Sequence, residues 1–187
     1  CNGCNHTCIF CMNRSMTRKI NKIKKETYLK IISEAKKLGV EELGLYTTGD
    51  PFMHKDLVYF IKKARTLGFK YVYLSTNGGL ATPQRLKEVL DAGLDSIKFS
   101  VNAGSRDTYH LIHGSDDWQK ILNHISFVSE YRTKNNLPTK IYISSIITKF
   151  TKHERSDIFN IFSDFVDEIY FVNCDAQQGH MFANEDK

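Results

Sequence analysis

The stretch Tyr71-Val-Tyr-Leu-Ser-Thr-Asn-Gly-Gly79 contains the unit from which the fold is built. Its first half is rich in aromatic and β-branched residues, which predicts a strand. The polar Ser-Thr-Asn-Gly segment that follows predicts a turn at the end of that strand. Thr82 and Pro83 then match the N-cap and first turn of a helix, which ends at Gly93. A strand, a polar turn and a helix in succession predict one βα unit of a parallel sheet.

The same alternation extends in both directions along the chain of 187 residues. Hydrophobic periodicity predicts further helices over 28–38, 57–67, 118–131 and 158–165, and further strands over 42–48, 96–101, 140–147 and 168–172. Strands separated by helices predict a parallel sheet with right-handed crossovers. An open α/β sheet and a partial or full (β/α) barrel both fit this pattern.

Three of the predicted strands end in small, polar, glycine-bearing loops. These loops are Thr47-Thr-Gly-Asp-Pro51, Ser75-Thr-Asn-Gly-Gly79 and Ser100-Val-Asn-Ala-Gly104. In parallel α/β folds the C-terminal ends of the strands meet at one edge, where ligands bind. Glycine and asparagine are also ordinary turn residues, but three such loops on one edge indicate a binding site.

Four of the five cysteines, Cys1, Cys4, Cys8 and Cys11, are crowded at the start of the chain, and Cys174 lies far away. An odd count with this crowding favours metal or redox chemistry over a disulfide framework. The C-x3-C-x2-C run from Cys4 to Cys11 would wrap one face of an iron–sulfur cluster and leave one iron open. All four cysteines would instead form a closed zinc or iron–sulfur site.

This cysteine run, followed by a glycine–acid–proline loop after the next strand and Thr-Asn-Gly after the one beyond, resembles the radical S-adenosylmethionine (radical SAM) superfamily. The resemblance implies a [4Fe-4S] cluster held by Cys4, Cys8 and Cys11, with S-adenosylmethionine chelating the fourth iron. It also implies an oxidoreductase that cleaves S-adenosylmethionine reductively to a 5′-deoxyadenosyl radical, which abstracts hydrogen from a substrate. Cys1 is then no ligand, because a fourth protein ligand would block the cofactor.

The resemblance also implies an architecture. We expect a partial (β/α)6 TIM-like barrel whose first strand is missing from the chain, which is then an excerpt of a longer protein. Residues 1–187 would form one radical SAM core domain, with a cluster loop and basic linker over 1–25, an α/β core over 26–173 and an irregular tail over 174–187.

The remaining cofactor contacts are carried over by position. Thr48, Gly49, Asp50 and Pro51 stand where the family has a Gly-Gly-Glu-Pro loop that holds the amine of S-adenosylmethionine. Phe10 would lie near the adenine, Ser100 and Asn102 would reach the ribose or carboxylate, and Asn77 is a further candidate. Ser144 and Ser145 point to opposite faces of their strand, and one of them would face the cavity.

Other notable residues are interpreted mainly as structural or solvent-exposed. His6 is interpreted as loop polarity, with a hydrogen-bond donor beside the metal site or a ligand as the alternative. The pair His110 and His113 is interpreted as no metal site, and Asp116 with Asp117 as a helix cap region. Cys174 is interpreted as a small buried hydrophobe. The basic run of Arg14, Arg18, Lys19, Lys22, Lys24 and Lys25 is interpreted as a solvated loop, with contact to an RNA substrate as the alternative.

The partners follow from the same reasoning. No apolar run approaches the ~20 residues of a membrane span, so we expect a soluble, cytoplasmic protein without a membrane partner. The resemblance implies an electron donor such as flavodoxin or ferredoxin. The 100–117 segment resembles family members with an extra cysteine-rich C-terminal (SPASM-type) domain, which favours a peptide or protein substrate over a small molecule or nucleic acid. The competing hypothesis is a non-catalytic metal-binding module that uses all four N-terminal cysteines.

Overall fold

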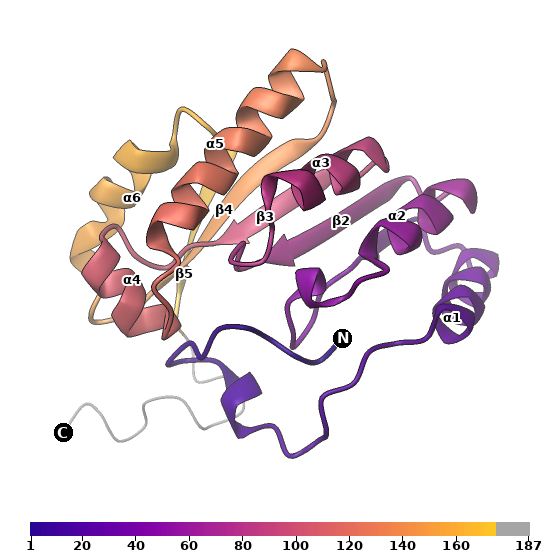
Figure 1. Ribbon diagram of the computed structural model, residues 1–187, viewed down its shortest axis with the longest axis horizontal. Helices are drawn as coiled ribbons and strands as arrows, with labels where there is room; N and C mark the ends of the chain where they lie inside the picture. The colour runs from indigo at the N-terminus through magenta and orange to yellow at the C-terminus, as the bar shows by residue number, and fades with distance from the viewer. Residues whose placement is uncertain (175–187) are drawn as a thin grey trace.

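A computed structural model describes residues 1–174 and contains a five-stranded sheet (Figure 1). The strands are β1 (Glu42–Gly44), β2 (Tyr71–Thr76), β3 (Ser96–Ser100), β4 (Lys140–Ile147) and β5 (Glu168–Asn173). They lie side by side in chain order, and every neighbouring pair is parallel. The predicted parallel sheet is therefore confirmed, and within residues 1–174 it stays open rather than closing into a barrel.

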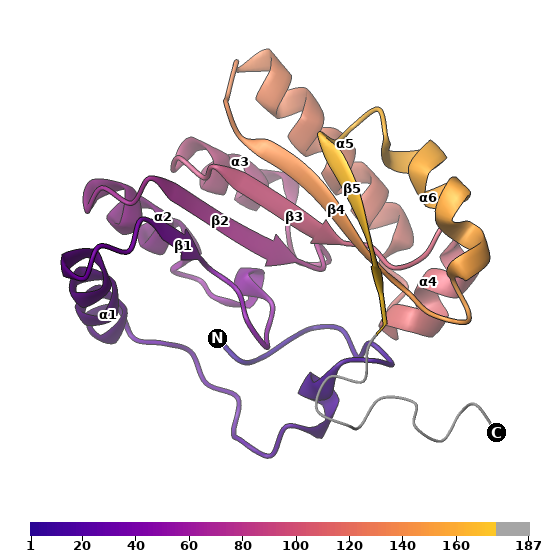
Figure 2. The ribbon, with the colours of Figure 1, turned by 180° about the vertical axis from the view of Figure 1, so that it is seen from behind.

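One helix precedes the first strand, and the others connect each strand to the next. They are α1 (Lys25–Lys37), α2 (Leu57–Thr66), α3 (Pro83–Asp91), α4 (Arg106–His113), α5 (Trp118–Lys134) and α6 (Arg155–Phe162). Single 3-10 turns lie at η1 (Met12–Ser15), η2 (Pro51–Met53) and η3 (Lys152–Glu154). Figure 2 shows the strands in front of α3 and α5, so these helices cover one face of the sheet and leave the other open.

The predicted helices and strands are all present, and most of their boundaries lie within three residues of the predicted ones. Strand β1 differs most, because it ends at Gly44, whereas the sequence predicted a strand to residue 48. His110 and His113 lie in a further helix, α4, which ends at the left-handed Gly114. Apart from Cys174, the expected irregular tail lies outside the described residues. No helix of residues 1–174 is long and apolar enough to cross a membrane.

The two faces of the sheet differ in character because side chains alternate along each strand. On β2, Val72, Leu74 and Thr76 are buried against the helices, while Tyr71, Tyr73 and Ser75 are partly exposed on the open face. The same alternation settles the question that the sequence left open on β4. Ser145 is fully buried on the helix side, and Ser144 lies on the open face.

The apolar core lies between the sheet and the helices. Its fully buried members include Ile61, Leu74, Leu86, Ile97, Phe99, Ile121 and Ile143. Burying one such side chain contributes about 2 kcal/mol, so this layer fixes the positions of the strand ends that carry the polar loops.

Leu74→Ala tests this layering. Leu74 is 0% exposed at the centre of β2, and the substitution removes buried methyl groups and leaves a cavity, so the free energy of unfolding falls by about 3 kcal/mol. Ile31→Ala, at a 52%-exposed position of α1, changes it by less than about 0.5 kcal/mol. Urea denaturation of the iron-free protein measures both. Equal losses for the two variants would contradict the proposed core.

Candidate metal and cofactor site

The cysteine loop, residues 4–11, docks against the last turn of α4. The backbone N–H of Thr7 donates to the carbonyl of His113 at 3.0 Å, and the N–H of Ile9 donates to the carbonyl of Ile112 at 2.9 Å. These carbonyls lie at the end of a helix, where the last four have no partner within the helix. Figures 1 and 2 show the loop crossing the C-terminal ends of β2 and β3, where the polar loops lie.

Glycines allow this close approach. A Cβ on Gly79 would lie 2.7 Å from the side chains of Asn5 and Asp117 and 2.8 Å from His6. A Cβ on Gly49 would lie 2.3 Å from the carbonyl oxygen of Gly3. The atoms near Gly49 belong to the backbone and cannot move aside, so this position needs glycine for the N-terminal segment to reach the strand end. The atoms near Gly79 belong to side chains, which would have to shift to admit a Cβ.

One pocket brings together the three cysteines and the seven cofactor contacts assigned from the sequence, without Pro51 of the same loop. Its lining contains Cys4, Cys8, Phe10, Cys11, Thr48, Gly49, Asp50, Asn77, Ser100 and Asn102. Thr47, Ser75 and Thr76, from the predicted strand-end loops, also line it, and so does Ser144, one of two alternatives on its strand. The sequence did not predict Tyr46, His113 and Ile146 as lining residues. Most of these follow from the topology, because they lie on or just beyond the C-terminal ends of the same strands.

Each sulfur of the C-x3-C-x2-C run lies beside one nitrogen. The amide Nδ2 of Asn77 donates to Cys4 Sγ at 3.4 Å, and the backbone N–H of Asn13 donates to Cys11 Sγ at 3.4 Å. The Nδ1 of His113 lies 3.6 Å from Cys8 Sγ. N–H groups directed at sulfur stabilise a thiolate, which is the form that binds metal.

Without a cation, however, the site favours the neutral thiols. Burial raises the pKa of Cys8 to about 12 and also raises the pKa of Cys4. Positive charge must therefore accompany deprotonation, and a metal centre supplies it.

The spacing of the sulfurs fits a cluster better than a single ion. Four ligands around one zinc ion at 2.3 Å lie about 3.8 Å apart. Within residues 1–174, one set of three potential ligand atoms gathers within 4.8 Å, namely His6, Cys8 and His113. Cys4, Cys8 and Cys11 do not form such a set although they line one pocket. An iron–sulfur cube binds its cysteines through different iron atoms and so holds the sulfurs farther apart than a single ion does, which is consistent with the absence of such a set.

Cys1 lies apart from these three cysteines. Its Sγ is 3.5 Å from the carbonyl oxygen of Gly3 and 3.8 Å from that of Asp50. It lines a separate hollow with Arg18, Lys22 and Thr48, among others, and is absent from the pocket that holds Cys4, Cys8 and Cys11. This placement disfavours a site built from all four N-terminal cysteines.

The carboxylate of Asp50 is directed inward, at the protein's own donors. One oxygen accepts from the N–H of Phe52 at 2.9 Å, and the other accepts from the Thr76 hydroxyl at 2.7 Å and the Asn77 N–H at 2.8 Å. The residue is 3% exposed, and this burial raises its pKa. Asp50 therefore joins the start of η2 to the end of β2, and any contact of this loop with an amine is left to its backbone.

Two predicted asparagines are also engaged within the chain. Asn102 Oδ1 accepts from the N–H of Ile146 at 2.7 Å, and its Nδ2 lies 3.2 Å from His113 Nε2. Asn77 bridges Cys4 and Asn5. Ser100 Oγ lies 3.4 Å from Ser75 Oγ on the neighbouring strand.

The structure corrects the interpretation of His6 as loop polarity and separates His113 from His110. His6 is 4% exposed and lies 3.1 Å from an Asp117 carboxylate oxygen, so it is not mere loop polarity. His113 is fully buried beside Cys8 and His6, whereas His110 is exposed on the surface. Asp117 is the N-cap residue of α5, in the region interpreted as a cap, but its side chain forms no capping hydrogen bond and contacts His6, Ser115 and Lys120 instead. The i, i+3 spacing of His110 and His113 gave no sign of the difference between these two histidines, because the contacts of His113 join positions about a hundred residues apart.

Comparison with known proteins finds a matching family and related proteins. A family model described as the radical SAM superfamily matches residues 1–162. A probable GTP 3′,8-cyclase of Saccharolobus solfataricus is 34% identical over 123 residues, which are 66% of this chain and 39% of that protein. An uncharacterized protein of Methanocaldococcus jannaschii is 30% identical over 167 residues, or 89% of this chain and 52% of that protein. The chain thus spans about two-fifths to half the length of these relatives.

Solved structures share the fold. Streptococcus suis SuiB bound to its precursor peptide SuiA covers 96% of this chain with a TM-score of 0.78 and 15% identity, over 39% of its own length. The structure of anSMEcpe with bound AdoMet covers 92% of this chain with a TM-score of 0.73 and 19% identity, over 49% of its own length.

Asp50→Ala tests the structural role of the carboxylate. The substitution leaves the Thr76 hydroxyl and the N–H groups of Phe52 and Asn77 without their acceptor, so the free energy of unfolding falls by about 3 kcal/mol. Asp56→Ala removes a carboxylate that pairs with Lys25 at the surface and costs less than about 1 kcal/mol. Urea denaturation of the iron-free protein measures the free energy of unfolding of both variants. An Asp50 variant as stable as the wild type would contradict this structural role and would favour a direct contact of the carboxylate with the cofactor.

Proposed function

The chain belongs to the radical SAM superfamily, whose enzymes use a [4Fe-4S] cluster and S-adenosylmethionine, and we propose that its cysteine loop and strand-end pocket hold these two groups side by side. Cys4, Cys8 and Cys11 would ligate the cluster. The observation that carries the proposal is the arrangement of these three sulfurs, each beside its own nitrogen, in a pocket shared with three glycine-bearing strand-end loops.

When bound, the cluster and S-adenosylmethionine supply an electron and a cleavable sulfonium, which together release a 5′-deoxyadenosyl radical. The chain's own residues orient the groups and exclude competing reactions. Gly49 brings the backbone of its loop to the pocket without a side chain, and Asp50 fixes that loop from behind. Phe10 offers an aromatic surface for the adenine, and Ser100 offers a hydroxyl to the ribose or carboxylate.

The experiment is anaerobic reconstitution with iron and sulfide, followed by dithionite reduction and low-temperature EPR with and without S-adenosylmethionine. The proposal predicts a [4Fe-4S]⁺ signal that changes when the cofactor is added, together with formation of 5′-deoxyadenosine. An EPR signal that does not change when S-adenosylmethionine is added would indicate a fourth protein ligand and would overturn the proposal. The longest available form of the protein is the appropriate sample, and in the cell a low-potential donor such as flavodoxin or ferredoxin would replace dithionite.

Cys1→Ser and Cys8→Ser separate the enzyme from a four-cysteine metal module. Because Cys1 lies in another hollow, its variant keeps the iron content, the EPR signal and 5′-deoxyadenosine formation of the wild type. Cys8→Ser removes a ligand and lowers cofactor cleavage by more than about a hundredfold. Loss of metal from the Cys1 variant, or tight zinc binding that needs all four cysteines, would favour the module.

We propose that the substrate binds on the open face of the sheet. Tyr73 shares that face with Ser75, Lys98 with Ser100 and Tyr142 with Ser144, because each pair is two residues apart on one strand. Since the three serines line the cofactor pocket, the tyrosines and Lys98 lie next to it. A peptide or protein substrate, as the sequence resemblance implies, would lie along this aromatic face.

A nucleoside triphosphate is the second candidate substrate, and Lys98 is the observation that favours it. The ammonium lies 5.6 Å from the centre of the Tyr46 ring and forms no ion pair among residues 1–174. This cation has no carboxylate partner and lies next to aromatic rings. Such a site can bind a nucleotide, because the ammonium pairs with a phosphate and an aromatic ring stacks on the base. The relatives named probable GTP 3′,8-cyclase also support a nucleoside triphosphate as the substrate.

Lys98→Met distinguishes the two candidates. The substitution keeps the length of the apolar stem and removes the charge, so binding of GTP weakens by about tenfold or more. Lys30→Met, on the exposed surface of α1, leaves binding unchanged. Calorimetric titration of the cofactor-loaded protein with GTP provides the measurement. No binding of GTP by the wild type would exclude the nucleotide and leave the peptide.

A further inference from the structure

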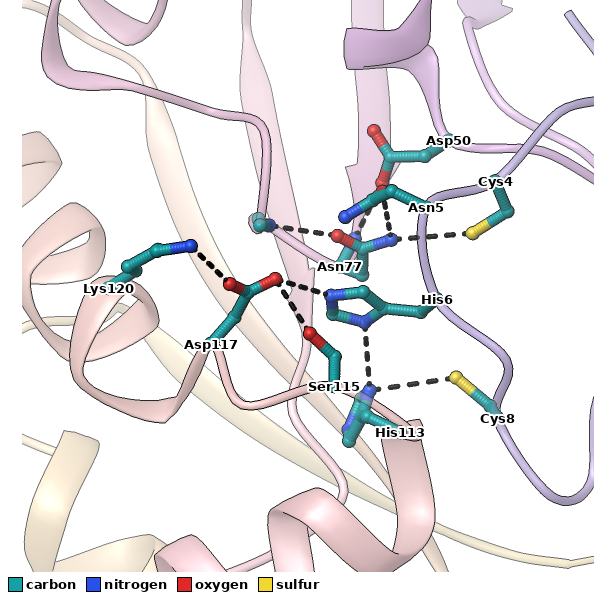
Figure 3. Close-up of polar contacts among 12 residues, drawn as sticks. Cys4, Asn5, His6, Cys8, Asp50, Asn77, His113, Ser115, Asp117 and Lys120 are labelled. Atoms are coloured by element: carbon teal, nitrogen blue, oxygen red, sulfur yellow. Dashed lines mark hydrogen bonds and ion pairs between the residues drawn. The ribbon is translucent and has the colours of Figure 1, made fainter.

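Behind the cysteine loop lies a chain of polar side chains that the proposed chemistry does not use. Figure 3 shows it running from Lys120 through Asp117 and His6 to His113, which reaches Cys8. The successive distances are 2.6 Å from Lys120 Nζ to Asp117 Oδ1, 3.1 Å from Asp117 Oδ2 to His6 Nε2 and 3.4 Å from His6 Nδ1 to His113 Nδ1. Both histidines are almost completely buried.

The surroundings of His113 fix which of its ring nitrogens carries the proton. The backbone N–H of Asn102 donates to Nε2 at 3.2 Å, and a backbone amide can only donate. The side chain of Asn102 directs Nδ2 at the same nitrogen, because its Oδ1 accepts from the N–H of Ile146. Because Nε2 accepts this hydrogen bond, it carries no proton and the ring is neutral. With Nε2 as the acceptor, the proton of a neutral ring lies on Nδ1.

The contacts of His6 also determine which of its ring nitrogens carries the proton. Its Nε2 faces a carboxylate oxygen of Asp117, which accepts, so the proton lies on Nε2 and Nδ1 is the acceptor. Its Nδ1 faces the protonated Nδ1 of His113 and accepts, so the ring is neutral as well. Asp117 is itself held by the Ser115 hydroxyl at 2.8 Å and by Lys120. The Nδ1–H of His113 therefore has two acceptors, His6 Nδ1 at 3.4 Å and Cys8 Sγ at 3.6 Å.

We propose that His113 is a positioning residue that donates its Nδ1–H to the sulfur of Cys8 and thereby raises the reduction potential of the cluster. The inference rests on the proposed function, because Cys8 becomes a thiolate only as a ligand. A thiolate is a stronger acceptor than a neutral ring nitrogen, so the proton turns from His6 toward the sulfur. His6 and Asp117 hold the His113 ring in the orientation that makes this possible.

The effect on the potential follows from charge. Reduction adds one negative charge to the cluster, and an N–H directed at a ligand sulfur stabilises the reduced form more than the oxidised form. His113 is 0% exposed, so little water screens its dipole from the sulfur. His113 thus gives Cys8 a side-chain donor, as Asn77 does for Cys4, while Cys11 has the backbone N–H of Asn13.

Two substitutions of His113 separate donation from packing. In His113→Asn the side-chain amide can occupy the place of Nδ1, which keeps a donor for the sulfur. In His113→Gln the longer side chain can reach the place of Nε2, which keeps a partner for Asn102 and leaves the sulfur without its donor. His110→Gln, on the exposed side of the same helix, is the control.

The measurement is an EPR-monitored redox titration of the reconstituted protein. We expect the Gln variant to lower the ratio of reduced to oxidised cluster about tenfold at a fixed potential, a shift of about 59 mV for a one-electron couple. The Asn variant and the His110 control stay near the wild type. A wild type that binds a full cluster and a Gln variant with an unchanged midpoint would overturn the inference and leave the proposed function intact.

A second readout needs no cluster. Nitrogen-15 NMR of the iron-free wild type reports the tautomer of each histidine, and we expect His113 protonated on Nδ1 and His6 on Nε2. An Nε2-protonated His113 would overturn the inference even if every variant failed to load iron. Failure of the wild type to assemble any cluster, or uptake of a single zinc ion by His6, Cys8 and His113, would overturn the proposed function and the inference with it.

Discussion

The site depends on the pairing of the cysteine loop with the last turn of α4. Two backbone N–H groups, of Thr7 and Ile9, donate to carbonyls that a helix end leaves without partners. This pairing brings a segment from the start of the chain to the C-terminal edge of the sheet. Without it the three sulfurs would have no fixed relation to the strand-end loops, which are held in place by the core beneath them.

Close backbone approach then determines which residues can stand at the contacts. Gly49 leaves room for the backbone of the N-terminal segment where any Cβ would collide with it, and Gly79 leaves room for the side chains of Asn5 and His6. Around these contacts, the buried polar groups satisfy one another: Asp50 takes the donors of the β2 end, and Asn102 holds both Ile146 and His113. A site with this many internal hydrogen bonds is preorganised, so its groups need little rearrangement to receive a ligand.

The sequence predicted the parts of this structure that periodicity and topology control. The ten residues assigned to the site line one pocket, because the C-terminal ends of parallel strands must meet at one edge. What it could not predict depends on contacts between distant positions. Nothing local distinguishes the buried His113 from the exposed His110, and the inward turn of the Asp50 carboxylate depends on donors from β2.

The central claim is that three cysteines hold a cluster whose remaining iron is free for the cofactor. Mössbauer spectroscopy of the protein reconstituted with iron-57 tests this directly, since it reports each type of iron site separately. The account predicts that S-adenosylmethionine changes the parameters of about a quarter of the cluster iron and leaves the rest unaltered. Unchanged Mössbauer parameters at all four iron sites after S-adenosylmethionine is added would contradict the account.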